Sequence, residues 1–462
     1  MKCNFARHLF VFTIFGCLTW ISSRALAQME YVDVRDQNGN VRKFSRLFMG
    51  TDHLDQGGWV QANQPPPTQD QIFAVLDEAV RNGINVIDTS PIYVGGIEHI
   101  VGNWLQARKE AILSDTFYAD KSLNPDRKIY VLSKGGFPFD LFYSKTLEPG
   151  QHSPELVATL QKQNILPEIQ GPGPQALQNV PPGSYASRLY GSSDQIKQNV
   201  TEELGHTTDN LNGQLTVYLM HRDDFDSVDF NVISRAQNSV GNIMEALSSP
   251  EVSGKFAILG FSNWTADRVV EAVQSSQQNP ALTRPRFNSP YFSLFEMGER
   301  SIHARGIQVK HADMMDPHFL EGVLINPYSP LGGFSILDKP SPAWDNAKAD
   351  AKIKHDTGDA YWQNVYLAIF TPQNDLRYQR AVDFLQMFNK TNGTQYSLDQ
   401  LLNAYALAHK RMDFLTVGPI TVDQVRRTVN SLFLSKRLTE GDLEYLYNVN
   451  PVAECQRLAR GF

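Results

Sequence analysis

The hydrophobic positions along the chain form two alternating patterns, short apolar runs and longer amphipathic stretches. The short runs are rich in β-branched or aromatic residues and end in polar or glycine-bearing turns, which is typical of buried strands. They predict eight strands: Arg46–Gly50, Asn85–Asp88, Ile129–Ser133, Leu215–Met220, Phe256–Phe261, Arg286–Asn288, Val323–Pro327 and Phe414–Gly418.

Helical spacing of apolar residues occupies most of the intervals between these runs. In residues 69–82, Ile72, Val75 and Val80 share one stripe, and Gly83 follows as a plausible C-cap. Further helices are predicted at Asp194–Gly205, Ala266–Ser276, Arg377–Phe388, Leu398–His409 and Val422–Leu434. Strands that alternate with helices indicate a parallel sheet, and eight such units close a barrel. We therefore predict an α/β fold, a (β/α)8 TIM barrel with long loop insertions.

The remaining length lies at the two ends and in two internal segments. Residues 1–27 have a basic start, an apolar run and a small-residue end at Ala27, which is the order of a secretory signal peptide. The apolar run is shorter than the ~20 residues needed to span a bilayer. We expect the signal to be cleaved and the chain to be exported (periplasmic, secreted or in a secretory-pathway lumen), or to be cytoplasmic if the start is misannotated. The barrel is expected over 28–434, with insertions at about 135–191 and 334–375 as lids or linkers and a tail at 435–462.

The composition excludes several classes of protein. Hydrophobic residues make up 42% and charged residues 20%, which excludes a mainly disordered chain. The 42 Lys and Arg against 49 Asp and Glu give a net charge of −7, so nucleic acid is a poor partner. Three cysteines exclude a disulfide framework, and a mean hydropathy of −0.33 excludes a polytopic membrane protein. A small-molecule partner is favoured.

Polar residues with acid–base chemistry follow consecutive predicted strands. Asp88 ends the second strand, with Tyr93 five residues later, and Lys134 and His221 follow the third and fourth strands. In a barrel these strand ends meet at one mouth. A phenol with a pKa near 10 needs its anion stabilised to transfer a proton at neutral pH. A neighbouring ammonium held by a carboxylate does this, and an imidazole orients a carbonyl oxygen.

The residues around these positions resemble the aldo-keto reductase family. Residues 87–93 (IDTSPIY) and 95–98 (GGIE) resemble that family's signature around its Asp and Tyr. Further similar segments follow in order between about Phe44 and Leu434: Val131–Lys134, Tyr218–Asp223, Leu259–Trp264, Tyr328–Gly333 and Ala404–Leu434.

The resemblance implies hydride transfer between NADP(H), with NAD(H) possible, and a carbonyl or alcohol substrate, such as an aldose or a small aldehyde or ketone. It implies that Tyr93 is the general acid and that Lys134 lowers the pKa of Tyr93. In the same way, Asp88 would hold Lys134 and His221 would orient the substrate.

The resemblance also implies a set of cofactor-binding residues. Ser262 and Asn263 would bind the nicotinamide carboxamide, Ser289 would replace the family's usual Gln, and Tyr328 would stack on the ring. The other implied contacts are Gly50 and Thr51 at the nicotinamide, Ser329, Leu331 and Gly333 along the pyrophosphate, and Thr421, Gln424, Arg426 and Arg427 near the 2′-phosphate. Because Ile420-Thr421 stands where the family usually has Arg or Lys followed by Ser, the preference for NADP over NAD is weakened.

Several alternatives stay open. The barrel could be a cofactor-binding regulatory or interaction protein with little turnover. The His311-Ala312-Asp313 segment with Asp316 and His318 has metal-ligand residue types, but it lies away from the expected mouth, and a solvated loop is favoured. Asp223 and Asp224 are expected in a solvated acidic loop. The aromatic residues of 137–190 either line a sugar site or pack on themselves. Export without a cytosolic cofactor pool suggests a tightly retained nucleotide.

Overall fold

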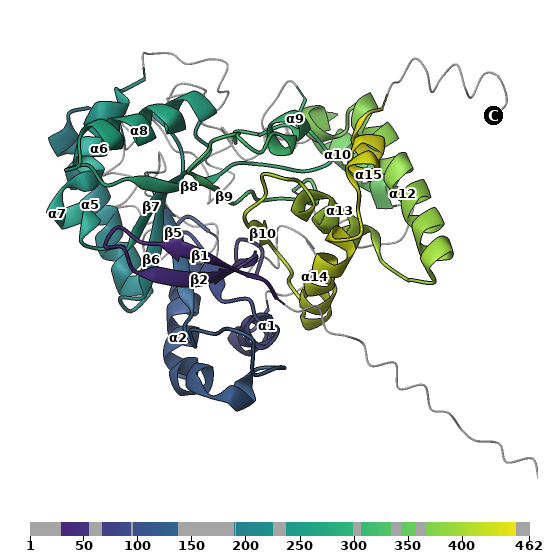
Figure 1. The fold of residues 1–462 in the computed structure, drawn as a ribbon, viewed down its shortest axis with the longest axis horizontal. Coiled ribbons are helices and arrows are strands. Elements are labelled where there is room, and N and C mark those ends of the chain that lie inside the picture. Colours follow the sequence, from purple (N-terminus) through teal and green to yellow (C-terminus); the bar gives the residue numbers. More distant parts are fainter. Residues whose placement is uncertain are drawn as a thin grey trace, which may run out of the picture.

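The protein is a parallel eight-stranded barrel surrounded by helices (Figure 1). A computed structural model describes residues 29–54, 67–93, 96–136, 189, 191–224, 237–298, 306–333, 343–356 and 366–449. The predicted signal peptide and most of the first insertion, with its aromatic residues, lie outside the described residues. None of the described helices is both long and apolar enough to cross a membrane.

The strands follow one another around the barrel in chain order. They are β3 (Leu47–Gly50), β4 (Val86–Asp88), β5 (Tyr130–Gly135), β6 (Leu215–Met220), β7 (Ile258–Ser262), β8 (Pro285–Ser289), β9 (Leu324–Ile325) and β10 (Leu415–Val417). All neighbouring strands pair in parallel. Phe414 N donates to Ile325 O (3.0 Å) and Thr416 N donates to Pro327 O (2.9 Å), which closes the sheet between β9 and β10. The predicted (β/α)8 fold is confirmed.

Helices cover the outside of the barrel. They are α1 (Gln69–Arg81), α2 (Ile97–Leu113), α5 (Ser193–Asn210), α6 (Val240–Ser248), α7 (Pro250–Ser253), α8 (Ala266–Gln278), α9 (His311–Met315), α10 (Ala343–Asp356), α12 (Pro372–Asn392), α13 (Leu398–Leu407), α14 (Val422–Ser435) and α15 (Glu440–Tyr447), with a 3-10 turn at Asp115–Phe117. Local chemistry fixes their starts: Thr68 with Gln71 and Ser192 with Gln195 form capping boxes at α1 and α5.

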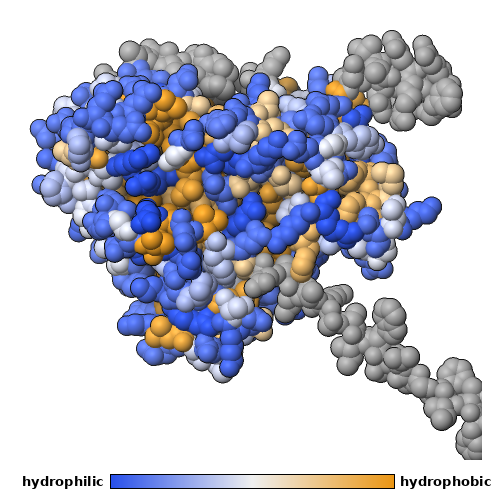
Figure 2. Space-filling view, in the orientation of Figure 1, coloured by the Kyte–Doolittle hydropathy of each residue, from blue (hydrophilic) through white to orange (hydrophobic). Residues whose placement is uncertain are grey.

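A hairpin that the sequence pattern did not predict forms the floor of the barrel. Its strands are β1 (Tyr31–Arg35) and β2 (Val41–Ser45), which pair antiparallel. Its backbone bonds to residues just before the barrel strands: Ser45 N donates to Asn85 Oδ1 (2.8 Å) and Gln37 N to Ala257 O (3.0 Å). Figure 2 shows that apolar side chains on this face gather toward the middle of the molecule, whereas the rim is mostly polar. The hairpin thus covers the amino ends of the strands.

The side-chain alternation of the strands decides what faces the lumen. Phe48, Val86, Leu132, Leu219 and Phe287 belong to one buried cluster inside the barrel, to which the hairpin adds Val34 and Phe44. The intervening residues pack outward against the helices. Asp88, Lys134, His221 and Ser289 each follow one of these lumen residues by two positions, so they face the lumen at the carboxyl end.

Two segments expected to be irregular contain packed helices. In the insertion at 334–375, Trp344 of α10 is only 2% exposed, and the centre of its ring lies 4.9 Å from the ring centres of Phe295 and Tyr378. In the tail, Leu443 and Leu446 of α15 are buried. Figure 1 shows α10, α12 and α15 grouped beyond α13, on one side of the barrel. The described parts of these segments therefore form helices rather than polar loops, and some of their apolar residues are buried.

Candidate active site

Lys134 joins the ends of β4 and β5 inside the barrel mouth. Its Nζ donates to a carboxylate oxygen of Asp88, to the Thr89 carbonyl (3.1 Å) and to the Tyr93 hydroxyl (2.9 Å). These three bonds use all the protons of an ammonium group. The side chains of Lys134 and Asp88 are only 4% and 3% exposed. The structure therefore brings together the carboxylate, amine and phenol that the sequence placed at neighbouring strand ends.

His221 completes the group from the end of β6. Its Nδ1 lies 3.3 Å from Ser90 Oγ, and Ser90 also accepts the backbone N–H of Tyr93 at its carbonyl (3.1 Å). The His221 and Tyr93 rings lie 6.1 Å apart in an edge-to-face arrangement. Ser90 therefore holds both the imidazole and the turn that carries the phenol, although it was noted in the sequence only as part of the motif.

Burial dominates the protonation of the two acids around Lys134. It raises the pKa of the Asp88 carboxyl, against the opposing effect of the ammonium. It also raises the pKa of the Tyr93 phenol well above its usual value, with a further rise from Asp88 and Asp52, whereas Arg222 opposes the rise. The loss of water around the phenolate outweighs the opposing charge of Arg222. Tyr93 is therefore a neutral phenol at physiological pH. The implied lowering of this pKa by Lys134 stays a prediction.

On the other side of the mouth, Asn263 organises a hydrogen-bonded network. Its Nδ2 donates to the His221 carbonyl (3.2 Å) and to Ser262 Oγ (3.0 Å). Its Oδ1 accepts from the Tyr328 hydroxyl (2.6 Å) and from Ile307 N (3.1 Å). Asn263 has a φ of 60°, a left-handed conformation that Asn tolerates better than most residues. These hydrogen bonds connect Asn263 to His221, Ser262 and Tyr328, which form one side of the mouth.

Ser289 provides a test of whether a cofactor amide fits on this side of the mouth. Ser289 pairs in register with Ser262, is 1% exposed, and its Oγ has no hydrogen-bond partner among the described residues. A buried hydroxyl without a partner is costly unless a bound group satisfies it. The residues fit a nicotinamide carboxamide: Ser289 and Ser262 would hold it, with Tyr328 beside them.

The remaining expected nicotinamide and pyrophosphate residues lie at the ends of β3 and β9. Thr51 donates from both its backbone N and its Oγ1 to the Asp88 carbonyl, each at 3.0 Å. A Cβ at Gly50 would lie 3.0 Å from Thr416 Cγ2, so glycine keeps β3 close to β10. Ser329 and Gly333 both have positive φ, 57° and 86°, in the turn that contains Leu331. These residues surround the same carboxyl end of the barrel.

The residues considered for the 2′-phosphate lie around the start of α14 and have protein partners. Gln424 Oε1 accepts from Ile420 N (2.7 Å), and Thr421 is the N-cap. Arg426 Nε lies 2.7 Å from Glu78 Oε1 on α1, and Arg427 Nε lies 3.1 Å from Asp399 Oδ2 on α13. Both guanidinium groups thus bind carboxylates of neighbouring helices.

Asp223 and Asp224 are buried rather than solvated, which corrects the expectation for this segment. Both are 0% exposed, and Asp223 pairs with Arg268 at 2.5 Å. Arg222 is also buried, and its Nη1 donates to the His221 carbonyl (2.7 Å). Arg222 was not predicted to be part of the site. Its position next to His221 was the only available signal.

The rival metal-ligand segment has another structural role. No group of three His, Cys, Asp or Glu side chains in the described part of the chain is arranged to hold a metal ion. His311, expected in a solvated loop, is 4% exposed, and its Nδ1 lies 2.9 Å from both Tyr405 Oη and His409 Nε2. Burial lowers the pKa of His409 to about 3, so the ring is neutral, and its Nδ1 donates to the Tyr405 carbonyl (2.8 Å), which leaves Nε2 as an acceptor. His311 Nε2 lies 3.1 Å from Glu444 of α15. The cluster attaches the C-terminal helix to the barrel.

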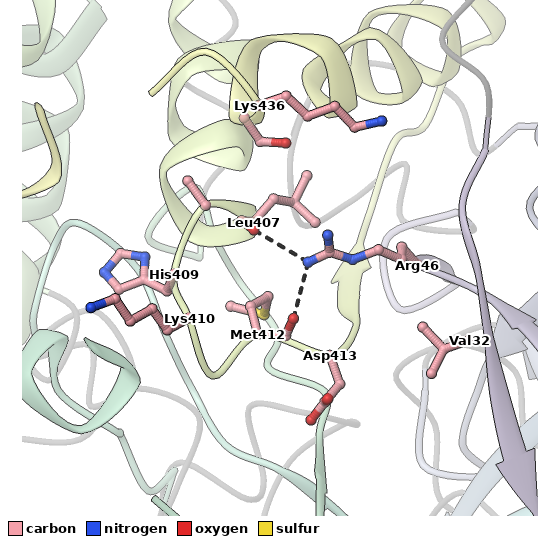
Figure 3. Close-up of a pocket in the computed structure, with 10 residues that line it drawn as sticks. Val32, Arg46, Leu407, His409, Lys410, Met412, Asp413 and Lys436 are labelled. Atoms are coloured by element: carbon pink, nitrogen blue, oxygen red, sulfur yellow. Dashed lines mark hydrogen bonds between the residues drawn. The ribbon is translucent and has the colours of Figure 1, made fainter. Parts of the chain in front are cut away.

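A cavity of about 420 Å³ lies at the opposite end of the barrel (Figure 3). Arg46, just before β3, reaches into it and donates to the carbonyls of Leu407 (3.2 Å) and Met412 (3.0 Å). It also pairs with Glu30 at 3.2 Å. This cavity sits at the amino ends of the strands, whereas catalytic groups of such barrels lie at the carboxyl ends. The candidate site is therefore the mouth around Lys134.

Comparison with known proteins identifies the family. The family model described as "Aldo/keto reductase family" matches residues 46–163 and 188–450. These ranges include the strand ends and the α14 segment described above. A search of curated proteins found no match.

Proposed function

Because the chain belongs to the aldo/keto reductase family, whose members are NAD(P)H-dependent carbonyl oxidoreductases, we propose that Tyr93 is its proton donor. The proposed substrate is an aldose or a small aldehyde or ketone, and the cofactor is NADP(H) or NAD(H). The observation that carries the proposal is the placement of Lys134 Nζ between Asp88 and the Tyr93 hydroxyl, 2.9 Å from the latter.

The mouth supports the proton-transfer half of a carbonyl reduction. A reduced nicotinamide nucleotide, when bound, supplies the hydride. Tyr93 donates its phenolic proton to the carbonyl oxygen, and the Lys134 ammonium stays hydrogen-bonded to the phenolate that remains. Asp88 holds Lys134 in place through its carboxylate, within a buried pair. His221, held through Nδ1 by Ser90, orients the carbonyl oxygen next to the phenol.

The site also supports the binding of the nicotinamide end. Ser262 and Ser289 carry hydroxyls on adjacent strands, and Ser289 Oγ, which has no partner in the part of the chain that the structure describes, offers a bond to the carboxamide. Tyr328 is held by Asn263 at the edge of the same surface. Burial raises the pKa of Tyr328 to about 12, so it stays neutral beside the ring.

Turnover with matched variants tests the proposal. Purified protein is mixed with NADPH or NADH and a panel of aldehydes, ketones and aldoses, and loss of absorbance at the nicotinamide band is followed. We expect turnover, and we expect Tyr93→Phe to lose about 10²- to 10⁴-fold in kcat, the usual contribution of a general acid. Tyr328→Phe, which keeps the ring, is the control for loss of a hydroxyl at the mouth. Tight cofactor binding without turnover on any substrate would favour the alternative of a regulatory barrel.

A further inference from the structure

Two buried carboxylates lie behind the end of β5, and neither belongs to the acid–base group. Glu98 is in the first turn of α2, Glu203 is on α5, and each is 1% exposed. They contact the strand on either side of Lys134. Burying a carboxylate is costly unless hydrogen bonds satisfy it. Their contacts with β5 therefore need a structural or functional reason.

Glu98 holds the residue before Lys134. Its Oε1 accepts from Ser133 Oγ (2.5 Å), and its Oε2 accepts from Asn210 Nδ2 (2.9 Å) at the end of α5. Ser133 points outward because side chains alternate along a strand, so Lys134 points into the lumen. Glu98 thereby fixes the rotation of β5 at the position that aims the amine toward Tyr93.

Glu203 holds the peptide unit that joins Gly135 to Gly136, one residue beyond Lys134. Its Oε2 accepts from Gly136 N (2.5 Å). The carbonyl of the same peptide unit, Gly135 O, accepts from His221 N (2.6 Å). One peptide group is thus bound at both poles, by a carboxylate and by the backbone of His221. A charged acceptor makes the stronger kind of hydrogen bond and polarises the peptide it holds.

The local geometry requires glycine on both sides of this peptide. A Cβ at Gly135 would lie 1.8 Å from Tyr218 Oη and 2.7 Å from Glu203 Oε2, so a larger residue cannot enter. Gly136 has a φ of +72°, which turns the chain away from β5. The glycine pair lets the carboxylate approach the backbone directly.

We propose that Glu98 and Glu203 are positioning residues for proton transfer: Glu98 aims Lys134 through Ser133, and Glu203 aligns Lys134 and His221 through the Gly135–Gly136 peptide. This rests on the proposed function, because it assigns both carboxylates to the same reaction. The chain from Gly136 to the start of α5 is far longer than the usual connection of 2–6 residues in such units.

Substitutions at Glu203 and at its exposed neighbour Glu202 test the proposal. In Glu203→Ala, kcat for carbonyl reduction falls about 10- to 100-fold, the cost of a small misplacement of reacting groups. The Kd for NADPH, from fluorescence titration, changes by less than about twofold, because Ser262, Ser289 and Tyr328 lie across the mouth. Glu203→Gln recovers most of the rate, since its amide oxygen still accepts from Gly136 N. Glu202→Ala behaves as the wild type.

A general loss of stability must be separated from a loss of alignment. Leu204→Ala, at the buried neighbour on α5, lowers Tm without touching the peptide, and we expect it to keep kcat per folded molecule. Equal losses of kcat in Leu204→Ala and Glu203→Ala would overturn the proposal.

A second readout does not depend on turnover. In protein labelled with ¹⁵N-histidine, the His221 ring signals are assigned by their absence in His221→Gln. We expect them to shift in Glu203→Ala but not in Glu202→Ala. Unchanged His221 signals in Glu203→Ala overturn the inference. If the wild-type protein shows no turnover but Glu203→Ala still shifts the His221 signals, the proposed function alone is refuted.

Discussion

Substitution of Lys134 by methionine isolates the energy of the buried pair at the mouth. Methionine keeps most of the side-chain volume but removes the ammonium, so the Asp88 carboxylate loses its charged partner and Tyr93 loses its donor. Removing one member of a buried ion pair costs about 3–5 kcal/mol. This is a large part of the ~5–15 kcal/mol that stabilises a typical native protein.

The loss must depend on pH, and its sign follows from Asp88. Burial already raises the pKa of this carboxyl, and Lys134 opposes the rise. Without Lys134 the folded-state pKa rises further above the unfolded value of about 3.9. Between those two values the folded protein holds a proton that the unfolded chain releases, so stability falls by up to about 1.4 kcal/mol per pH unit as pH rises. From about pH 4 to pH 7 the fall is at most ~4 kcal/mol, which matches the cost of breaking the pair.

Urea unfolding at several pH values measures this loss. We expect Lys134→Met to be close to the wild type near pH 4 and to become progressively less stable toward about pH 7. The double variant Asp88→Asn/Lys134→Met has no carboxylate to ionise, so it should recover stability at neutral pH and lose the pH dependence. Two results would contradict this prediction: the single variant loses the same free energy at all these pH values, or the double variant is as unstable as the single one at neutral pH.

Three further predictions concern other parts of the barrel. Because burial raises the pKa of Tyr93, the kcat for reduction should stay level through neutral pH while the reverse oxidation rises with pH; parallel profiles in the two directions would contradict this. Glu78→Ala removes the 2.7 Å partner of Arg426 and should tighten NADPH binding relative to NADH about two- to fivefold, as the energy of an exposed ion pair allows; the two Kd values measure it, and an unchanged ratio would place Arg426 away from the cofactor. Asp223→Asn leaves Arg268 without its buried carboxylate and should lower the free energy of unfolding by about 3–5 kcal/mol in urea. In that experiment Asp267→Asn, at an exposed position, is the control.

The strand positions could be predicted because burial on both faces leaves a continuous apolar run. Leu215–Met220 has the bounds that the pattern indicated, and the other strands differ only at their ends. From these positions the alternation of side chains placed Asp88, Lys134 and His221 in one mouth. Their protonation could not be predicted in this way, because the pKa of Tyr93 depends on how much water the closed barrel excludes.

The missed elements depend on contacts far away in the sequence. Within the two hairpin strands only Val34, Phe44 and Ser45 are buried, and the backbone is satisfied by groups such as Asn85, so the local pattern is weak. Helix α15 buries two leucines and is held by the pair His311–Glu444. The burial of Asp223 is likewise decided by Arg268, 45 residues later. A charge-rich segment such as the one around Asp223 is therefore predicted to be solvated unless its distant partner is known.

The apolar filling of the barrel links its stability to its chemistry. Phe48, Phe287 and Phe414 pack below the mouth, with ring centroids 4.8 Å apart for Phe48 and Phe414 and 5.6 Å apart for Phe287 and Phe414. These buried rings exclude water from the barrel interior below Asp88 and Lys134, which makes the attraction between the two charges stronger than it would be in water. The same dryness raises the pKa of Tyr93 and keeps its proton in place. The residues that stabilise the fold thus also keep Tyr93 protonated at neutral pH, which is the form that can donate a proton to a carbonyl oxygen.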